Sequence, residues 1–455
     1  MRTVLTLRVS PWRREALRTS LWFVPSLLLI AIIGLFAATY ALDLHVYDAG
    51  ITLPAWIQLE SADGARTLLS GLAAGVITVL GVVFSVTIVA LTLASQQFGP
   101  RMLRNFVRDL GTQLTLGAFV ATFVYSILTL GSIGGGSRSV TFVPQISVTV
   151  ALALVFVNVL MLIYFIHHIT LLIQLPAVIS SIASTLATAI DLQFPARGRS
   201  RAENLGTGRT LTELLARLDA EGAEVVATTS GYLQYVGHAR LVEIVERHGA
   251  VVQLIYRPGH FITRGLPLAR VWPPSAADAV LPALARAHIT GPHRTIEQDA
   301  VFAIDQLVEI AIRALSPAVN DTFTALTCID WLADGLCTIS ERELPDGLHR
   351  DRAGAIRVIE LAPSYERMVN RAYDKVRQAG VGMTAVSMRL LEGLARVVAY
   401  AQDDTQRAIL YRQADMIMRG CDSTIADPED LEAIRGRYRD ARDGRSAKPY
   451  PAPPA

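Results

Sequence analysis

The stretch Leu68–Ala94, LLSGLAAGVITVLGVVFSVTIVALTLA, contains no Asp, Glu, Lys or Arg. A helix rises about 1.5 Å per residue and the hydrocarbon core of a bilayer is about 30 Å thick, so about 20 apolar residues cross it. Three more stretches, about 21–42, 114–133 and 146–173, are equally free of charge. The sequence therefore predicts an α-helical membrane protein with a four-helix transmembrane domain at residues 20–175.

The arginines of the connecting segments indicate the orientation of these spans. Five arginines lie in the basic N-terminal segment 1–19, and three lie between the second and third spans. The other two loops hold one arginine each, Arg66 and Arg138. Because basic loops stay in the cytoplasm, we predict both termini inside, in a bacterial inner (cytoplasmic) membrane. Arg101 and Arg104 would then anchor at the inner headgroups.

The remainder of the chain has the composition of a soluble protein, and we expect a cytoplasmic α+β domain there. Residues 176–209 are predicted to be a connector, and 210–273 a small β-rich module. The glycine-containing turns of this module resemble those of small lipoyl-like β-modules. Residues 274–445 have helical patterns and predict a helical bundle. The proline-rich tail, 446–455, is predicted to be disordered.

Several classes of protein are disfavoured by composition and motifs. The net charge of +2 gives no indication of a nucleic-acid partner. The three cysteines, Cys328, Cys337 and Cys421, form no CxxC pair, so no metal site is expected. No GxGxxG, P-loop, GxSxG or HExxH motif occurs. We therefore expect neither an enzyme nor a bound cofactor.

The second span carries small and polar residues along one helical face. Two interpretations remain open. Such residues let helices pack closely and form hydrogen bonds with each other, or they line a water-filled pathway without fixed charge. Both hold if the second spans of several subunits meet at an axis. The stripe comprises Gly71, Gly75, Thr78, Ser85, Thr92 and Gln96, at spacings of 4, 3, 7, 7 and 4, and Gln97 follows it.

The third and fourth spans also carry polar residues. Thr115, Thr122 and Thr129 recur at intervals of seven in the third span. His167 and His168 lie near the cytoplasmic end of the fourth. Interfacial polarity accounts for this histidine pair, and a pH-sensing or permeation role is the alternative.

A polar turn, Ser316–Asp321, separates two predicted helices of the soluble half. It has two interpretations. As a double cap, Ser316 ends the first helix while Asn320 and Asp321 begin the second. As a functional site, the same oxygens contact a ligand or another subunit.

Three sets of motifs resemble the bacterial membrane family called domain of unknown function 2254. The resemblance implies a membrane topology like the one above, and it draws attention to Gln234 and His260 as contacts for a ligand or subunit. The family pattern leads us to expect an acidic residue at His260 and a proline at Thr322. The motifs are Gly81–Ser85 with Ala94–Arg101, Ser230–Gln234 with Arg257–Phe261, and Ala314–Thr322.

These observations lead to two hypotheses of function. The first is a homo-oligomeric channel or ion-conducting pore with a cytoplasmic regulatory domain. The second is a membrane-anchored regulatory or scaffold protein that binds a cytoplasmic partner or small ligand. The stripe of the second span motivates the first, and the size of the soluble half motivates the second.

Overall fold

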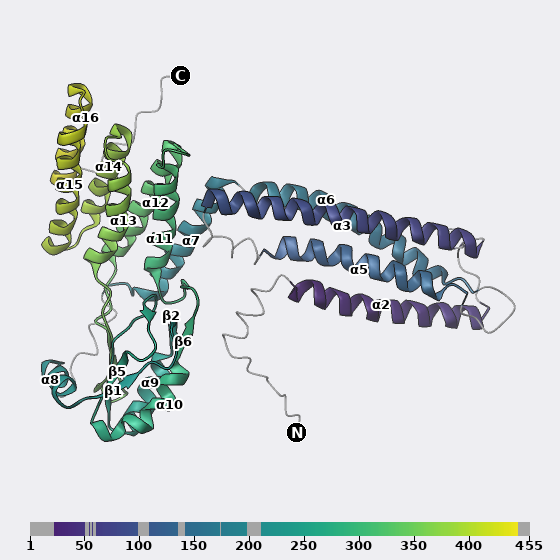
Figure 1. Ribbon diagram of the computed structural model, residues 1–455, viewed down its shortest axis with the longest axis horizontal. Helices are drawn as coiled ribbons and strands as arrows, with labels where there is room; N and C mark the ends of the chain where they lie inside the picture. Colours follow the sequence, from purple (N-terminus) through teal and green to yellow (C-terminus); the bar gives the residue numbers. More distant parts are fainter. Residues whose placement is uncertain are drawn as a thin grey trace. The chain divides into compact units, whose positions relative to one another are not determined.

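The computed structural model describes residues 22–50, 54, 57, 61–98, 109–134, 142–172, 174–197 and 211–444, without the side chains of 94–98 and 172. The chain divides into two compact units, Met1–Val178 and Ile179–Ala455. Figure 1 shows long helices in the first unit and mixed helices and strands in the second.

The first unit is built from four helices that lie side by side: α2 (Phe23–Asp48), α3 (Ala62–Phe98), α5 (Leu110–Ser132) and α6 (Gln145–Leu172). Helix α5 packs against the other three and is the most buried of them. Its Thr115, Thr122 and Thr129 side chains are buried inside the unit. Thr115 and Thr129 donate to the carbonyls one turn back, at 2.9 and 2.8 Å. The polar residues of the third span therefore serve packing within one chain.

A fifth helix, α7 (Leu175–Gln193), occupies much of the predicted connector. Five described helices are long and apolar enough to cross a membrane, not four, and α7 is the fifth. Most of α7 belongs to the second unit, where Ile182, Leu186 and Ile190 are buried. Leu186 packs so closely on Gly335 that a Cβ atom there would lie 2.7 Å from its methyl group. The apolar character that qualifies α7 as a span therefore also supplies the core of the second unit.

The second unit contains two sheets, of strand order β1-β5-β3-β8-β7 and β4-β2-β6. The β3–β8 pair is parallel and joins Val252 to Val358, far apart in the sequence. Strands β6, β7 and β8 lie beyond residue 273, so the sheets extend outside the module predicted at 210–273. The strands within 210–273 therefore do not form a separate lipoyl-like module. The strands are β1 (Ala223–Val226), β2 (Gly231–Val236), β3 (Val251–Leu254), β4 (Phe261–Ile262), β5 (Pro267–Trp272), β6 (His288–Gly291), β7 (Leu348–Arg350) and β8 (Ile356–Ile359).

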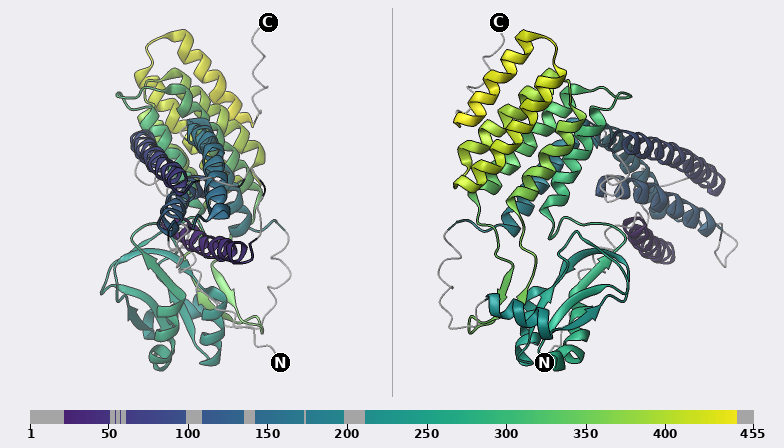
Figure 2. Two further views of the ribbon diagram at one scale, coloured as in Figure 1. Left: turned by 90° about the vertical axis from the view of Figure 1, so that its right-hand side faces the viewer. Right: turned by 60° about the vertical axis from the view of Figure 1, so that its left-hand side comes forward.

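Helices complete this unit. Leu241 and Val245 of α9 pack with Val358 and with strand residues of β3 and β5 in one apolar core. Figure 2 shows the later helices stacked against one another beyond the sheets. The elements are α8 (Leu211–Glu221), α9 (His238–Arg247), η1 (Pro274–Ala276), α10 (Ala277–Ala287), α11 (Ala300–Ala314), α12 (Thr322–Glu341), α13 (Tyr365–Ala379), α14 (Thr384–Tyr400), α15 (Asp404–Thr424) and α16 (Pro428–Asp443).

Candidate functional site

The polar stripe of α3 faces outward from the first unit. Gly71, Gly75, Thr78, Ser85 and Thr92 are all exposed. A Cβ atom added at either glycine would meet nothing within 4 Å. The Thr78 and Thr92 hydroxyls donate only to carbonyls of their own helix, at 2.7 and 2.9 Å. The described part of this chain therefore supplies no helix for the stripe to pack against.

Two valines complete the outward face and reveal its period. Val82 and Val89 are 56% and 55% exposed and fall between the stripe residues. The face then repeats at alternating steps of four and three, which is the seven-residue period of helices that pack with a left-handed crossing. The side of α3 that packs within the unit lies roughly opposite and buries Ala73, Val76 and Val83. Helix α3 therefore has one partnered face and one unpartnered face. We call this seven-residue-period surface of α3 the outward face; in order, its residues are Gly71, Gly75, Thr78, Val82, Ser85, Val89 and Thr92.

The end of this stripe lies at the limit of the described residues. Gln96 and Gln97 belong to the last turns of α3, and their side chains are not described. Arg101 and Arg104 lie outside the described residues. Their predicted roles as a polar exit and as interfacial anchors stay predictions.

Two carboxylates bind the starts of helices in the first unit, and motif analysis missed both. Asp43, near the end of α2, is buried and accepts hydrogen bonds from the backbone N–H groups of Ile146 and Ser147 at 2.8 and 2.9 Å. Asp109 caps α5 and lies 2.9 Å from His168 Nε2. His168 is therefore one partner of a defined pair. In the sequence, the only local indication of these caps is that each acidic residue lies beside an apolar run.

The Ser316–Asp321 turn connects α11 to α12 by capping both helices. The Ser316 hydroxyl donates to the Arg313 carbonyl at 2.7 Å, and the Asp321 carboxylate accepts from the Thr324 N–H at 3.1 Å. Asn320 takes a left-handed conformation with φ of +50°. The turn also displays Phe323, which is 84% exposed. The Ser316 and Asp321 side chains thus have structural partners, while the apolar tip of the turn has none among the described contacts.

Gln234 and His260 come close together through strand pairing. The Leu233 N–H donates to the His260 carbonyl at 2.9 Å, and the Gln234 amide donates to the His293 carbonyl at 2.7 Å. His260 lies near the start of α11, because its neighbour Gly259 faces Asp299, the residue before Ala300. The Ser316 turn follows the other end of α11, which is roughly 22 Å away by the helical rise. The predicted cytoplasmic contacts therefore do not form one site.

The loop that carries His260 rests on a buried acid. Gly259 has φ of +91°, and a Cβ atom there would lie 2.0 Å from the Asp299 Oδ2 atom. Only glycine fits this position. Asp299 in turn accepts from Arg294 at 2.6 Å, and the same guanidinium reaches Asp305 at 2.5 Å. Burial opposes ionisation of Arg294, but the two carboxylates outweigh it and raise its pKa.

Positive charge exceeds negative charge around this loop. Burial, with the charges of Arg367 and Arg294, lowers the pKa of Arg257. Burial and the same arginines, with Arg257, lower the pKa of His260 to about 4, so His260 is neutral at pH 7. Neither Arg257 nor Arg367 forms an ion pair with a carboxylate of the described residues. Where the family pattern leads us to expect an acid, His260 accepts a hydrogen bond from Arg257 Nε at 3.3 Å instead. The cluster comprises Arg257, Arg294, Arg367 and Arg371 against Asp299 and Asp305.

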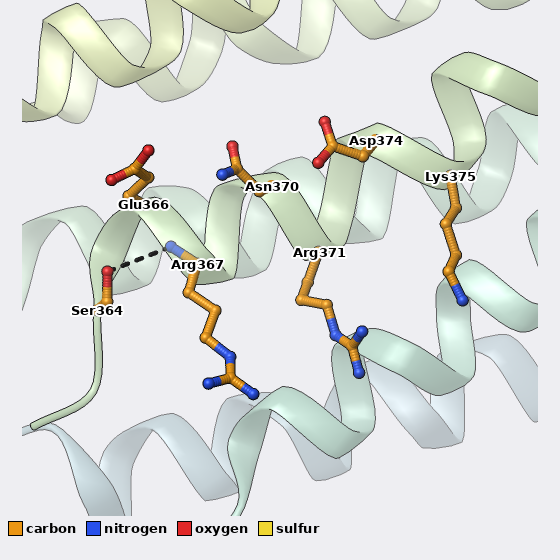
Figure 3. Close-up of a pocket in the computed structure, with 7 residues that line it drawn as sticks. All are labelled: Ser364, Glu366, Arg367, Asn370, Arg371, Asp374 and Lys375. Carbon is orange, nitrogen blue, oxygen red and sulfur yellow. Dashed lines mark hydrogen bonds between the residues drawn. The ribbon is translucent and has the colours of Figure 1, made fainter. Parts of the chain in front are cut away.

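Helix α13 extends this arginine cluster along a cavity of about 400 Å³. In Figure 3, Arg367, Arg371 and Lys375 project to one side of the helix, and Glu366 and Asp374 project to the other. The first side presents a row of cations, which is the chemistry that attracts phosphate or carboxylate groups. The full lining is Ser364, Glu366, Arg367, Asn370, Arg371, Asp374 and Lys375.

Apolar helices of membrane-spanning length and a mixed helix and sheet region define a multi-pass membrane protein. The chain belongs to the family described as predicted membrane protein (DUF2254), whose profile matches residues 18–396. It is similar to uncharacterized proteins of Mycobacterium tuberculosis and Mycobacterium bovis, with 31% identity over 377 residues, or 82% of this chain and 71% of theirs. No solved structure matches the chain.

Proposed function

We propose that the chain forms a homo-oligomeric channel in the bacterial inner membrane, in which the outward faces of α3 from several subunits surround a shared axis. Helices α2, α3, α5 and α6 would cross the membrane, and the start of α2 and the end of α6 would both lie on the cytoplasmic side. The second unit would regulate the channel from the cytoplasm. The observation that carries the proposal is the outward, unpartnered face of α3.

The composition of that face favours other helices over lipid as its neighbours. Glycine at Gly71 and Gly75 lets backbones approach closely, and this gains contacts only where another helix is present. The hydroxyls of Thr78, Ser85 and Thr92 would supply polar surface without fixed charge. By contrast, the threonines of α5 are already buried within the chain.

Helix α7 is the fifth apolar helix, and we assign it a different role. Its buried stripe, from Ile179 to Ile190, belongs to the core of the second unit. A helix that crossed the bilayer would not also fill the interior of a soluble domain. We therefore propose that α7 connects the membrane domain to the soluble unit.

Conductance of the reconstituted full chain tests the channel. Ser85→Val should change ion flux into liposomes, because it replaces an outward hydroxyl with two methyl groups. Ser70→Val is the matched control, since Ser70 is an exposed serine of α3 outside the outward face. Absence of flux at every voltage, membrane tension and pH tried, with the protein correctly inserted, would refute the channel.

The arginine cluster supports a second candidate, a membrane-anchored regulator that binds a small anionic ligand. Two of its cations, Arg257 and Arg367, lack a carboxylate partner in the described part of the chain. Calorimetric titration of the detergent-solubilised chain with inorganic phosphate tests this function. Arg367→Gln should weaken binding, whereas Arg240→Gln, at another exposed arginine, should not. Equal affinities in the two variants would exclude the cluster as the binding site.

A further inference from the structure

Three side chains from separate elements converge at one edge of the large sheet. His238 begins α9, His349 lies in β7, and Glu360 directly follows β8. His238 Nε2 lies 2.8 Å from Glu360 Oε2, and His349 Nε2 lies 3.2 Å from Glu360 Oε1. One donor atom from each residue falls within 4.8 Å of the others. None of the three belongs to the α3 face or the arginine cluster.

The backbone holds these groups in fixed positions. His349 pairs with Val358 across the β7–β8 hairpin, and Glu360 lies two residues further along the same face. The Glu360 N–H donates to the Gly347 carbonyl at 2.8 Å. Gly347, with φ of +74°, allows an approach in which a Cβ atom would lie 2.4 Å from the Glu360 carbonyl oxygen. The β7–β8 hairpin therefore fixes the positions of His349 and Glu360 relative to each other.

Helix α9 brings the third donor to the same edge. Leu241 and Val245 of α9 share an apolar core with Val358 of β8, which fixes the helix against the hairpin. The rings of His238 and His349 stack with centroids 4.0 Å apart and planes 14° from parallel. The stacking aligns both Nε2 atoms on the same carboxylate. A cation between the three donors would replace the two hydrogen bonds with coordinate bonds.

The donor set and its spacing match the preferences of zinc-class ions. Two imidazole nitrogens and one carboxylate oxygen form a common three-residue zinc set with a further position for water. Tetrahedral bonds of about 2.0–2.1 Å separate neighbouring donors by about 3.3 Å. The distances of 2.8 Å from His238 to Glu360 Oε2 and 3.2 Å from His349 to Glu360 Oε1 are close to this value, and one donor atom of each residue lies within 4.8 Å of the others. The side chains are 15–29% exposed, so an ion and a water molecule can enter.

A third imidazole, that of His288, is close enough to feel the charges of His238 and Glu360. His288 pairs with Val236, two residues before His238. Its Nδ1 atom bonds to the Leu284 carbonyl at 2.9 Å, so the proton is on Nδ1 and the lone pair is on Nε2. That Nε2 atom is buried and has no partner among the described residues. Metal-binding histidines show this arrangement, in which one nitrogen is held by a carbonyl and the other is left to coordinate.

We propose that His238, His349 and Glu360 bind a divalent transition-metal ion of the zinc class. The ion links the start of α9 to the β7–β8 hairpin and leaves one position for water. Coordination at this edge would stabilise the folded second unit in proportion to the free ion concentration.

Zinc titration of the full chain tests the site directly. The chain should be purified in detergent without a polyhistidine tag, stripped with a chelator and titrated with Zn²⁺ against a chromophoric competitor. One tight ion per chain is expected. His238→Ala, His349→Ala and Glu360→Gln should each weaken binding by about 100-fold or more, beyond the typical loss from outer-shell changes. His248→Ala, at an exposed histidine directly after α9, is the control and should bind as wild type does.

A second measurement covers variants that fail to fold. In the wild-type chain, Zn²⁺ should protect His238 and His349 from diethyl pyrocarbonate, while His248 remains reactive. Unchanged zinc affinity in all three variants overturns the proposal. So does equal modification of His238 and His248 in the presence of Zn²⁺.

Discussion

The Asp43 carboxylate accepts two hydrogen bonds from Ser147, one from the backbone N–H at 2.9 Å and one from the hydroxyl at 2.6 Å. The two residues are 104 positions apart. Through them, the end of α2 caps the start of α6. In an apolar bundle, this contact satisfies N–H groups that have no partner within their own helix.

Replacing Asp43 should therefore destabilise the membrane unit. Asp43→Ala removes the acceptor of several hydrogen bonds at a buried position, at a cost of about 1–3 kcal/mol. We expect a lower Tm for the chain in detergent micelles. Asp48→Ala, at the exposed end of the same helix, should leave Tm unchanged. Equal Tm values for both variants would show that the cap contributes nothing measurable.

Contact between α3 helices of different subunits can be detected by cysteine crosslinking. Ser85→Cys lies on the outward face and should form disulfide-linked dimers in native membranes under mild oxidation. Phe84→Cys is as exposed as the valines of that face but points elsewhere on the helix, and it should crosslink poorly. Similar yields from both positions would contradict a defined α3 interface. Cys337, which is partly exposed, should first be replaced by serine.

A comparison of Gly259 and Gly265 distinguishes the cost of a left-handed backbone from the cost of a steric clash with a neighbouring side chain. Gly259 and Gly265 have φ of +91° and +83°, but only Gly259 faces a neighbour, Asp299. Gly265→Ala should cost about 1 kcal/mol for left-handed backbone alone. Gly259→Ala should cost more, because Asp299 and its Arg294 pair must move. Chemical unfolding of the second unit, followed in the full chain, should show this order, and the reverse order would be inconsistent with the contact.

The low pKa of His260 predicts a defined dependence of stability on pH. Burial and the charges of Arg257, Arg367 and Arg294 lower this pKa from 6.5 to about 4. Between these values the unfolded chain binds more protons than the folded chain, so stability falls as pH falls. The contribution is fully present above about pH 6.5 and is lost as pH approaches 4.

His260→Gln should make the unfolding free energy less dependent on pH between 6.5 and 4. The measurement is denaturant unfolding at a series of pH values. His248→Gln, at an exposed position, should retain the wild-type slope. A slope for His260→Gln as steep as that of wild type would assign the dependence to other groups.

The sequence by itself was sufficient to predict the apolar helices α2, α3, α5 and α6 and the membrane family. Each property is local: an unbroken run without charge, or a motif of consecutive residues. The same kind of local pattern is why the sequence does not distinguish whether α7 crosses the membrane or belongs to a protein core. Hydropathy records how apolar a helix is, and a membrane or a protein core can bury the same face of Ile182 and Leu186.

Only the tertiary structure decided which polar residues have partners. The heptad-like spacing is similar in α3 and α5, yet Thr122 is buried while Ser85 is exposed, because α5 is surrounded by three helices. The pairs Asp43–Ser147 and His238–Glu360 join residues more than 100 positions apart. Such contacts depend on how helices and strands pack, and no periodicity of the separate segments encodes them. The sequence thus specified these apolar helices, and packing determined which of their faces remain available for function.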